Sequence, residues 1–194
     1  MKHFAELLLN RNKPKSYDQE PFIKGKRGIE IKSSREIKLM KKSSKVVATV
    51  LKEVKDFVKP GISTKDIDDF AERRIRQLGA VPSFKGYQGF PSSICSSVNN
   101  EVVHGIPNKN KIIKEGDLLK IDTGALLNGY HGDSCITICV GAVSDEVQNL
   151  SDVAYRALFA GISKIKAGNT LLDIAGAIED VVKGNGYSVV EDYT

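Results

Sequence analysis

Two aspartates in the middle of the chain are the residues best suited to chemistry. Asp122 ends the segment Leu-Leu-Lys-Ile-Asp, and Asp133 follows Tyr-His-Gly, with the dipeptide Asn128-Gly129 between them. Asn-Gly between apolar segments predicts a β-hairpin closed by a two-residue type I′ turn, because both residues tolerate a positive φ. In that register Asp122 and Asp133 are diagonal neighbours on one face, with backbones about 7–8 Å apart.

Paired carboxylates at this separation favour a divalent cation. Two negative charges so close repel each other and raise one pKa unless a cation lies between them. Oxygen ligands suit hard or borderline divalent metals. Two interpretations without a metal site remain open. Aspartates that flank a loop often serve turn chemistry or solubility, and a β-bulge, which Gly124, Gly129 and Gly132 would permit, would change the register.

The segments around these aspartates resemble a known enzyme family. They are Asn-Glu-Val-Val-His-Gly-Ile-Pro from Asn100, Ile-Asp-Thr-Gly from Ile121 and His-Gly-Asp-Ser from His131. Together with Gly-Tyr-Gln-Gly-Phe-Pro from Gly86, these motifs are similar to those of type I methionine aminopeptidases, in unbroken order over residues 29–194. The resemblance implies an α+β pita-bread fold, with a curved antiparallel sheet, outer helices and an incomplete second half.

The resemblance also implies an activity and a site. The activity is removal of the N-terminal initiator methionine from nascent proteins, by hydrolysis at a centre of two divalent metal ions (Co, Mn, Fe or Zn). Asp122 and Asp133 correspond to metal ligands, and His104 to a catalytic histidine that contacts the substrate near the scissile amide. Gln88 stands where many relatives carry a histidine, so it receives no role. The residues that match the pocket for the methionine side chain are Tyr87, Phe90 and Cys95.

The chain contains an internal repeat at a spacing of 107 residues. The positions Lys59, Gly61, Asp66, Ile67, Glu72 and Gly79 recur as Lys166, Gly168, Asp173, Ile174, Glu179 and Gly186. Each copy has a helix that ends at Lys-x-Gly, a helix capped by Ser63 or Thr170, and a glycine that ends this helix. The repeat fits the two pseudo-symmetric halves of a pita-bread fold.

The repeat limits the metal site that this chain can offer. Thr194 corresponds to Tyr87 of the first copy, so the second copy has no counterpart of the Asp122 hairpin. By resemblance, the three remaining metal ligands, a histidine and two glutamates, would follow Thr194. The chain then carries two of five ligands, and weak, rapidly exchanging metal binding is expected.

Periodicity and capping signals predict the elements that hold these residues. Ser33 and Glu36 form a capping box at the start of a helix that stops at Pro60-Gly61. Further helices are expected near residues 65–78, 145–166 and 171–183, besides strands near residues 81–84, 94–98, 102–104 and 187–190 and the Asp122 hairpin.

Composition predicts a folded protein of the cytoplasm. Hydrophobic residues make up 41% of the 194 residues, yet no apolar run approaches the roughly 20 residues of a membrane helix. Phe4 to Leu9 is a poor secretory signal, because it includes Glu6 and lacks a small-residue cleavage pattern. The three cysteines form no Cys-x-x-Cys pair, which indicates reduced thiols, and Cys135 and Cys139 are expected to be small buried side chains.

Charge is concentrated near the start of the chain. Residues 1–45 hold 13 Lys or Arg against 5 Asp or Glu, and the remaining residues hold 16 against 19. Residues 1–28 are predicted to be a flexible basic extension, ahead of an aminopeptidase-like domain over residues 29–194. Association with the ribosome through this arm is one hypothesis, and a solvated tail is the other.

Two other functional classes remain to be weighed. A non-catalytic pita-bread module that binds peptide or RNA would be expected to lose the site residues, and this chain keeps Asp122, Asp133 and His104. A metal-dependent phosphoesterase finds no phosphate-binding glycine loop in the sequence. The sequence therefore favours a monomeric aminopeptidase that acts on the N-terminal methionine of nascent peptides.

Overall fold

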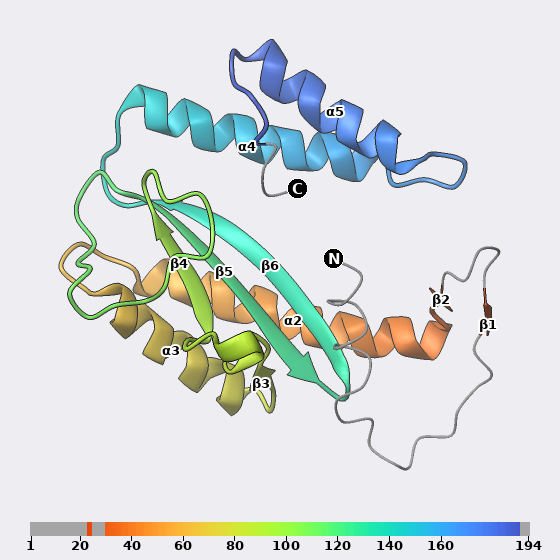
Figure 1. Cartoon of the computed structure of the whole chain (residues 1–194), viewed down its shortest axis with the longest axis horizontal. Coiled ribbons are helices and arrows are strands. Elements are labelled where there is room, and N and C mark those ends of the chain that lie inside the picture. Colours follow the sequence, from red (N-terminus) through yellow and green to blue (C-terminus); the bar gives the residue numbers. More distant parts are fainter. Residues whose placement is uncertain (1–22, 25–29, 191–194) are drawn as a thin grey trace. The chain divides into compact units, whose positions relative to one another are not determined.

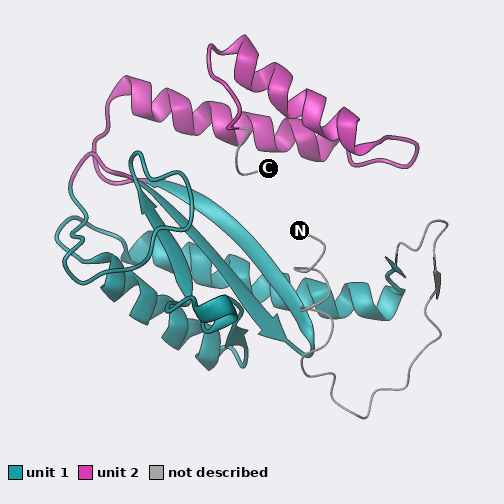
Figure 2. Ribbon diagram, in the orientation of Figure 1, with its two compact units in different colours: residues 1–114, 119–138 teal, residues 115–118, 139–194 magenta. Residues whose placement is uncertain are grey.

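The computed structural model describes residues 23–24 and 30–190 (Figure 1). The chain forms two compact units: residues 1–114 with 119–138, and residues 115–118 with 139–194 (Figure 2). Among the described residues, no helix is both long enough and apolar enough to cross a membrane.

Two amphipathic helices form one layer of the first unit. They are α2 (Ser34–Phe57) and α3 (Thr64–Gln77), which lie next to each other (Figure 1). Both begin at the predicted capping boxes, with Ser33 and Ser63 as the N-caps. An ion pair between Arg74 and Glu53, at 2.5 Å, joins the two helices.

An antiparallel sheet forms the other layer, with β5 at its centre. Its strands are β3 (Val81–Pro82), β4 (Ile94–Val98), β5 (Leu118–Leu127) and β6 (Tyr130–Cys139). β3 and β4 pair with successive parts of β5, and β6 also pairs with β5. The predicted hairpin is confirmed, because only Asn128 (φ 53°) and Gly129 (φ 83°) separate β5 from β6.

Alternation between buried and half-buried residues over 119–123 of β5 separates a core face from an open face. Leu119, Ile121, Thr123 and Ala125 are fully buried. The helices α2 and α3 cover this side of the sheet (Figure 1). Because successive side chains of a strand point to opposite faces, the even-numbered residues of β5, including Asp122, lie on the face away from these helices.

Helix α2 also fixes the hairpin. The hydroxyl of Ser43 donates to the carbonyls of Leu127 (3.2 Å) and Tyr130 (2.8 Å), at the two sides of the turn. Gly132 of β6 lies so close to α2 that an added Cβ would be 2.5 Å from the amide nitrogen of Ser44. The even residues of β6 therefore face α2, and the odd residues share the open face with Asp122.

Asp68 attaches helix α3 to the start of β4. Its fully buried carboxylate accepts hydrogen bonds from the amides of Ser93 (2.8 Å) and Ile94 (3.2 Å), and from Lys65 Nζ (3.0 Å). Buried amides need acceptors, so this one side chain fixes where β4 begins.

The second unit consists mainly of the helices α4 (Asp145–Ser163) and α5 (Leu171–Gly184). Both bounds of α5 lie 107 residues after those of α3, and Thr170 with Asp173 repeats the capping box. The predicted repeat is therefore present in the helices. It does not extend to a covering sheet among residues 145–190: Leu51 is 3% exposed, whereas its counterpart Leu158 is 53% exposed.

Several sequence-based expectations are wrong. Residues 102–104 form no strand, because the positive φ of His104 (58°) is incompatible with extended backbone. Residues 187–190 also form no strand, and no partner strand lies beside them in the described part of the chain. Cys135 is exposed and Cys139 is half-buried, because odd residues of β6 face away from α2.

Most of the basic arm over residues 1–28 lies outside the described residues. Its described part is β1 (Ile23–Lys24), which pairs antiparallel with β2 (Glu30–Ile31).

Candidate metal and substrate site

The hairpin brings Asp122 and Asp133 together on the open face of the sheet. Its two-residue loop sets Leu127 opposite Tyr130, and the same register sets Gly124 opposite Asp133. Asp122 follows on the same face, and the two carboxyl groups lie close enough for each to shift the pKa of the other.

The pKa values of both carboxyl groups in this pair are raised above their ordinary values. Desolvation and the nearby Asp133 carboxylate raise the pKa of Asp122 to about 6. Desolvation also raises the pKa of Asp133, although the hydrogen bond from Asp122 and the charge of His131 lower it in part. A cation between the two carboxylates would reverse both shifts.

The donor set fits part of a divalent metal site. Asp122 and Asp133 supply oxygen ligands of the kind that Mn²⁺, Fe²⁺, Co²⁺ and Zn²⁺ accept. Cys95 lies directly opposite Asp122 in the β4–β5 pairing, but burial raises the pKa of its thiol to about 12. A thiol that stays protonated is a poor metal ligand. Within residues 30–190, no three His, Cys, Asp or Glu side chains are grouped closely enough to hold a metal ion.

The loop between β4 and β5 places His104 near the carboxyl pair. The amide of Gly105 donates to Ser97 Oγ (3.0 Å), and its carbonyl accepts from Ser96 N (2.7 Å). An added Cβ at Gly105 would be 2.3 Å from Ser96 O, so only glycine allows the loop this close to β4. His104 adopts a left-handed conformation (φ 58°), and its charge lowers the pKa of Asp122 in opposition to the larger effects. Such backbone strain is typical of functional positions.

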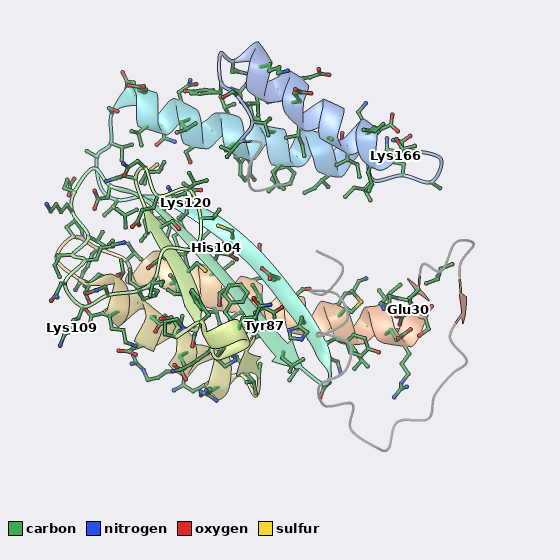
Figure 3. All side chains as sticks on the ribbon, in the orientation of Figure 1. Glu30, Tyr87, His104, Lys109, Lys120 and Lys166 are labelled. Carbon is green, nitrogen blue, oxygen red and sulfur yellow. The ribbon has the colours of Figure 1, made fainter. Side chains whose placement is uncertain are left out.

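Tyr87 and Phe90 lie in the short turn that leads into β4. The turn contains the 3₁₀ segment Tyr87–Gly89 and is closed by Phe90 N to Tyr87 O (2.9 Å) and Gly86 N to Phe90 O (2.8 Å). Both aromatic side chains are half-buried. Figure 3 labels Tyr87 of this turn and His104 of the loop between β4 and β5. Gln88 has a positive φ (47°) and donates to Tyr87 Oη at 3.3 Å.

Sequence reasoning missed other polar groups on the open face. Lys120 precedes Asp122 by two residues, and its ammonium donates to the carbonyl of Asn99 at 2.5 Å. Ser83 Oγ and His131 Nδ1 are hydrogen-bonded at 2.8 Å. The alternation that placed Asp122 and Asp133 on one face also places Lys120 and His131 there, so the signal was present in the sequence.

Comparison with known proteins identifies the family. The model of metallopeptidase family M24 matches residues 38–194. The chain belongs to metallopeptidase family M24. The fold agrees: the structure of the methionine aminopeptidase from Thermotoga maritima superposes with a TM-score of 0.82 at 39% identity, over 84% of this chain and 66% of that one.

Relatives of this M24 chain are methionine aminopeptidases, so the resemblance found in the sequence is confirmed. Methionine aminopeptidase 1 of Bacillus subtilis is 48% identical over 162 residues, which are 84% of this chain and 65% of the relative. The methionine aminopeptidase of Clostridium acetobutylicum is 45% identical over 165 residues, which are 85% of this chain and 66% of the relative. The chain thus spans just under two thirds of the length of these curated relatives.

Proposed function

We propose that this M24 chain belongs to an enzyme that removes the N-terminal methionine from nascent peptides. The observation that carries the proposal is the placement of the Asp122 and Asp133 carboxylates side by side on the open face of the sheet. Family M24 is a metallopeptidase family, which agrees with a metal-holding role for this pair. The two carboxylates would hold divalent metal, with Co, Mn, Fe and Zn as candidate ions and two ions in the whole site.

Bound metal would supply a water of lowered pKa and polarise the peptide carbonyl. The residues of this chain would bind and orient the substrate. His104, near Asp122, would hydrogen-bond the scissile amide as charge develops there, a contribution of about 2–4 kcal/mol if it equals that of other oxyanion donors.

The methionine side chain would lie against the turn before β4. Tyr87 and Phe90 offer half-buried aromatic rings, and Cys95 offers a buried, protonated thiol opposite Asp122. A thioether is polarizable and interacts well with aromatic edges. This pocket therefore suits methionine better than a charged side chain, because a charge would lose its hydration without gaining a partner.

The test is release of methionine from a Met-Ala-Ser peptide in the presence of Co²⁺ or Mn²⁺. The chain is compared with the double variant D122A/D133A, and binding of Mn²⁺ alone is measured for both by electron paramagnetic resonance. We expect weak, rapidly exchanging Mn²⁺ binding that the double variant abolishes, and any turnover to disappear with it. Equal Mn²⁺ binding by the double variant would refute the assigned site.

The remaining assignments concern the whole protein and are part of the same proposal. Residues 29–194 would form the aminopeptidase-like domain of a cytoplasmic monomer, and the basic residues 1–28 an arm that associates with the ribosome. Electrostatic attraction to RNA weakens steeply with salt. Co-sedimentation with ribosomes should therefore fall between about 50 and 200 mM salt, and a variant that lacks residues 1–28 should not co-sediment. Salt-independent co-sedimentation would contradict the electrostatic role of the arm.

A further inference from the structure

A hydrogen bond crosses the central strand next to the carboxyl pair. Ser83, just after β3, donates its amide to the carbonyl of Gly124 at 2.9 Å, so it lies at one edge of β5. His131 belongs to β6, at the other edge of β5. Ser83 Oγ and His131 Nδ1 are nevertheless 2.8 Å apart. The two side chains therefore meet above β5 at the level of Gly124.

Gly124 is the residue that allows this crossing. A Cβ at this position would be 2.9 Å from Ser83 Cβ, 3.0 Å from Phe84 Cε1 and 3.1 Å from Ser83 Oγ. Glycine in the interior of a strand weakens it and often marks a close approach of other groups. Here the groups that approach are the side chains that cross β5.

The crossing ends beside Asp133. Gly132 faces α2, where its missing Cβ leaves room for the helix backbone, so His131 and Asp133 both point to the open face. The hairpin register also sets Gly124 opposite Asp133. The charges of His131 and Asp133 act on each other. A ring with one nitrogen held by Ser83 has a fixed orientation toward this carboxylate.

His131 is placed to position a ligand and not to serve as one. Within the described residues it forms no group with Asp122 and Asp133 that could hold a metal ion. The hydrogen bond between its Nδ1 and Ser83 fixes the orientation of the ring. Groups that orient metal ligands matter nearly as much as the ligands themselves.

We propose that the Ser83–His131 hydrogen bond over Gly124 is a positioning device, which fixes the His131 ring beside Asp133 and thereby orients this carboxylate for a divalent cation. The inference rests on the proposed metal site. It assigns Ser83, Gly124 and His131 to that site as positioning residues, and none of them is a catalytic residue.

The experiment measures binding of Mn²⁺ alone to the full 194-residue chain by electron paramagnetic resonance. We expect S83A, H131F and G124A each to weaken Mn²⁺ binding roughly tenfold, as loss of an outer-shell partner commonly does. S83T keeps the hydroxyl and should bind within about twofold of the original chain, by the same reasoning. The matched control is S44A, which removes a serine hydroxyl that donates to Met40 O at 3.1 Å on the exposed side of α2.

Two further measurements separate positioning from folding. The ¹⁵N chemical shift of His131 Nδ1 should move in S83A and G124A and stay in S83T and S44A. Urea unfolding curves of each variant show whether it is folded in the absence of urea, so that Mn²⁺ binding is compared only between folded chains. S83A and H131F that bind Mn²⁺ as the original chain does would overturn the inference. Mn²⁺ binding that survives D122A/D133A would instead overturn the proposed function.

Discussion

Replacing Asp68 by alanine should destabilise the first unit far more than loss of an acidic residue from a charged helix usually does. The carboxylate is fully buried and accepts from two buried amides, Ser93 N and Ile94 N, at 2.8 and 3.2 Å. A buried amide left without an acceptor costs about 1–3 kcal/mol, so the two together cost about 2–6 kcal/mol. The ion pair of Asp68 with Lys65 adds little, because Lys65 is exposed at its end and keeps Asp69 at 2.6 Å.

The matched control is D69A, which removes the other carboxylate from Lys65 and no amide partner. With a urea m-value of about 2 kcal/mol/M, a loss of about 3 kcal/mol lowers the urea midpoint by about 1.5 M. D69A should change the free energy of unfolding by less than about 1 kcal/mol. Hydrogen exchange gives the local readout, since the amides of Ser93 and Ile94 should lose protection in D68A alone. Equal losses in the two variants, or amides that stay protected in D68A, would refute the reasoning.

Three other perturbations test separate parts of the structure. Although desolvation opposes them, hydrogen bonds from Lys85 and Arg76 lower the pKa of Glu72 to about 2. The ionised Glu72 carboxylate stabilises the fold by up to about 3 kcal/mol. This stabilisation is complete above the unfolded pKa of about 4.3 and is lost as pH falls toward 2. In E72Q the melting temperature should therefore depend less on pH in this acid range. Because the pKa of Asp122 is raised to about 6, protons should compete with metal, and the Mn²⁺ affinity measured by titration should fall as pH is lowered from 7.5 to 5.5. G132A places a Cβ 2.5 Å from Ser44 N of α2 and should lower the free energy of unfolding in urea by about 1–3 kcal/mol. The control is G129A, whose Cβ meets nothing within 4 Å and which therefore measures the strain of positive φ alone.

Local signals explain why much of the fold could be predicted from the sequence. Asn128-Gly129 fixed the hairpin because a type I′ turn needs positive φ at both positions, and the structure has 53° and 83° there. Capping boxes at Ser33, Ser63 and Thr170 marked three helix starts, because side chain and backbone satisfy each other within four residues. Each of these signals is complete within a short stretch of chain.

The errors concern features that depend on distant residues. The segment before Gly105 has the composition of a strand, but hydrogen bonds to Ser96 and Ser97 turn it into a loop that carries His104 in a left-handed conformation. Asp68 reads as one more acid on a charged helix, and only its partners 25 and 26 residues away show why it is buried. The Ser83–His131 pair joins positions 48 residues apart. The one local signal for this contact in the sequence was Gly124, a glycine in the interior of a strand.

The geometry of the open face depends on contacts made on the buried face. Asp122 and Asp133 lie on the face away from α2 and α3, so the position of their backbone depends on how the sheet packs against these helices. Ser43 fixes the hairpin turn from α2, Gly132 sets how closely β6 approaches that helix, and Asp68 fixes the start of β4. A shift of β5 by one residue would turn Asp122 toward the core and away from Asp133 of β6. Conservative substitutions on the helix side of the sheet should therefore alter metal affinity before they unfold the chain. The geometry of the open face thus depends on how α2 and α3 pack against the sheet.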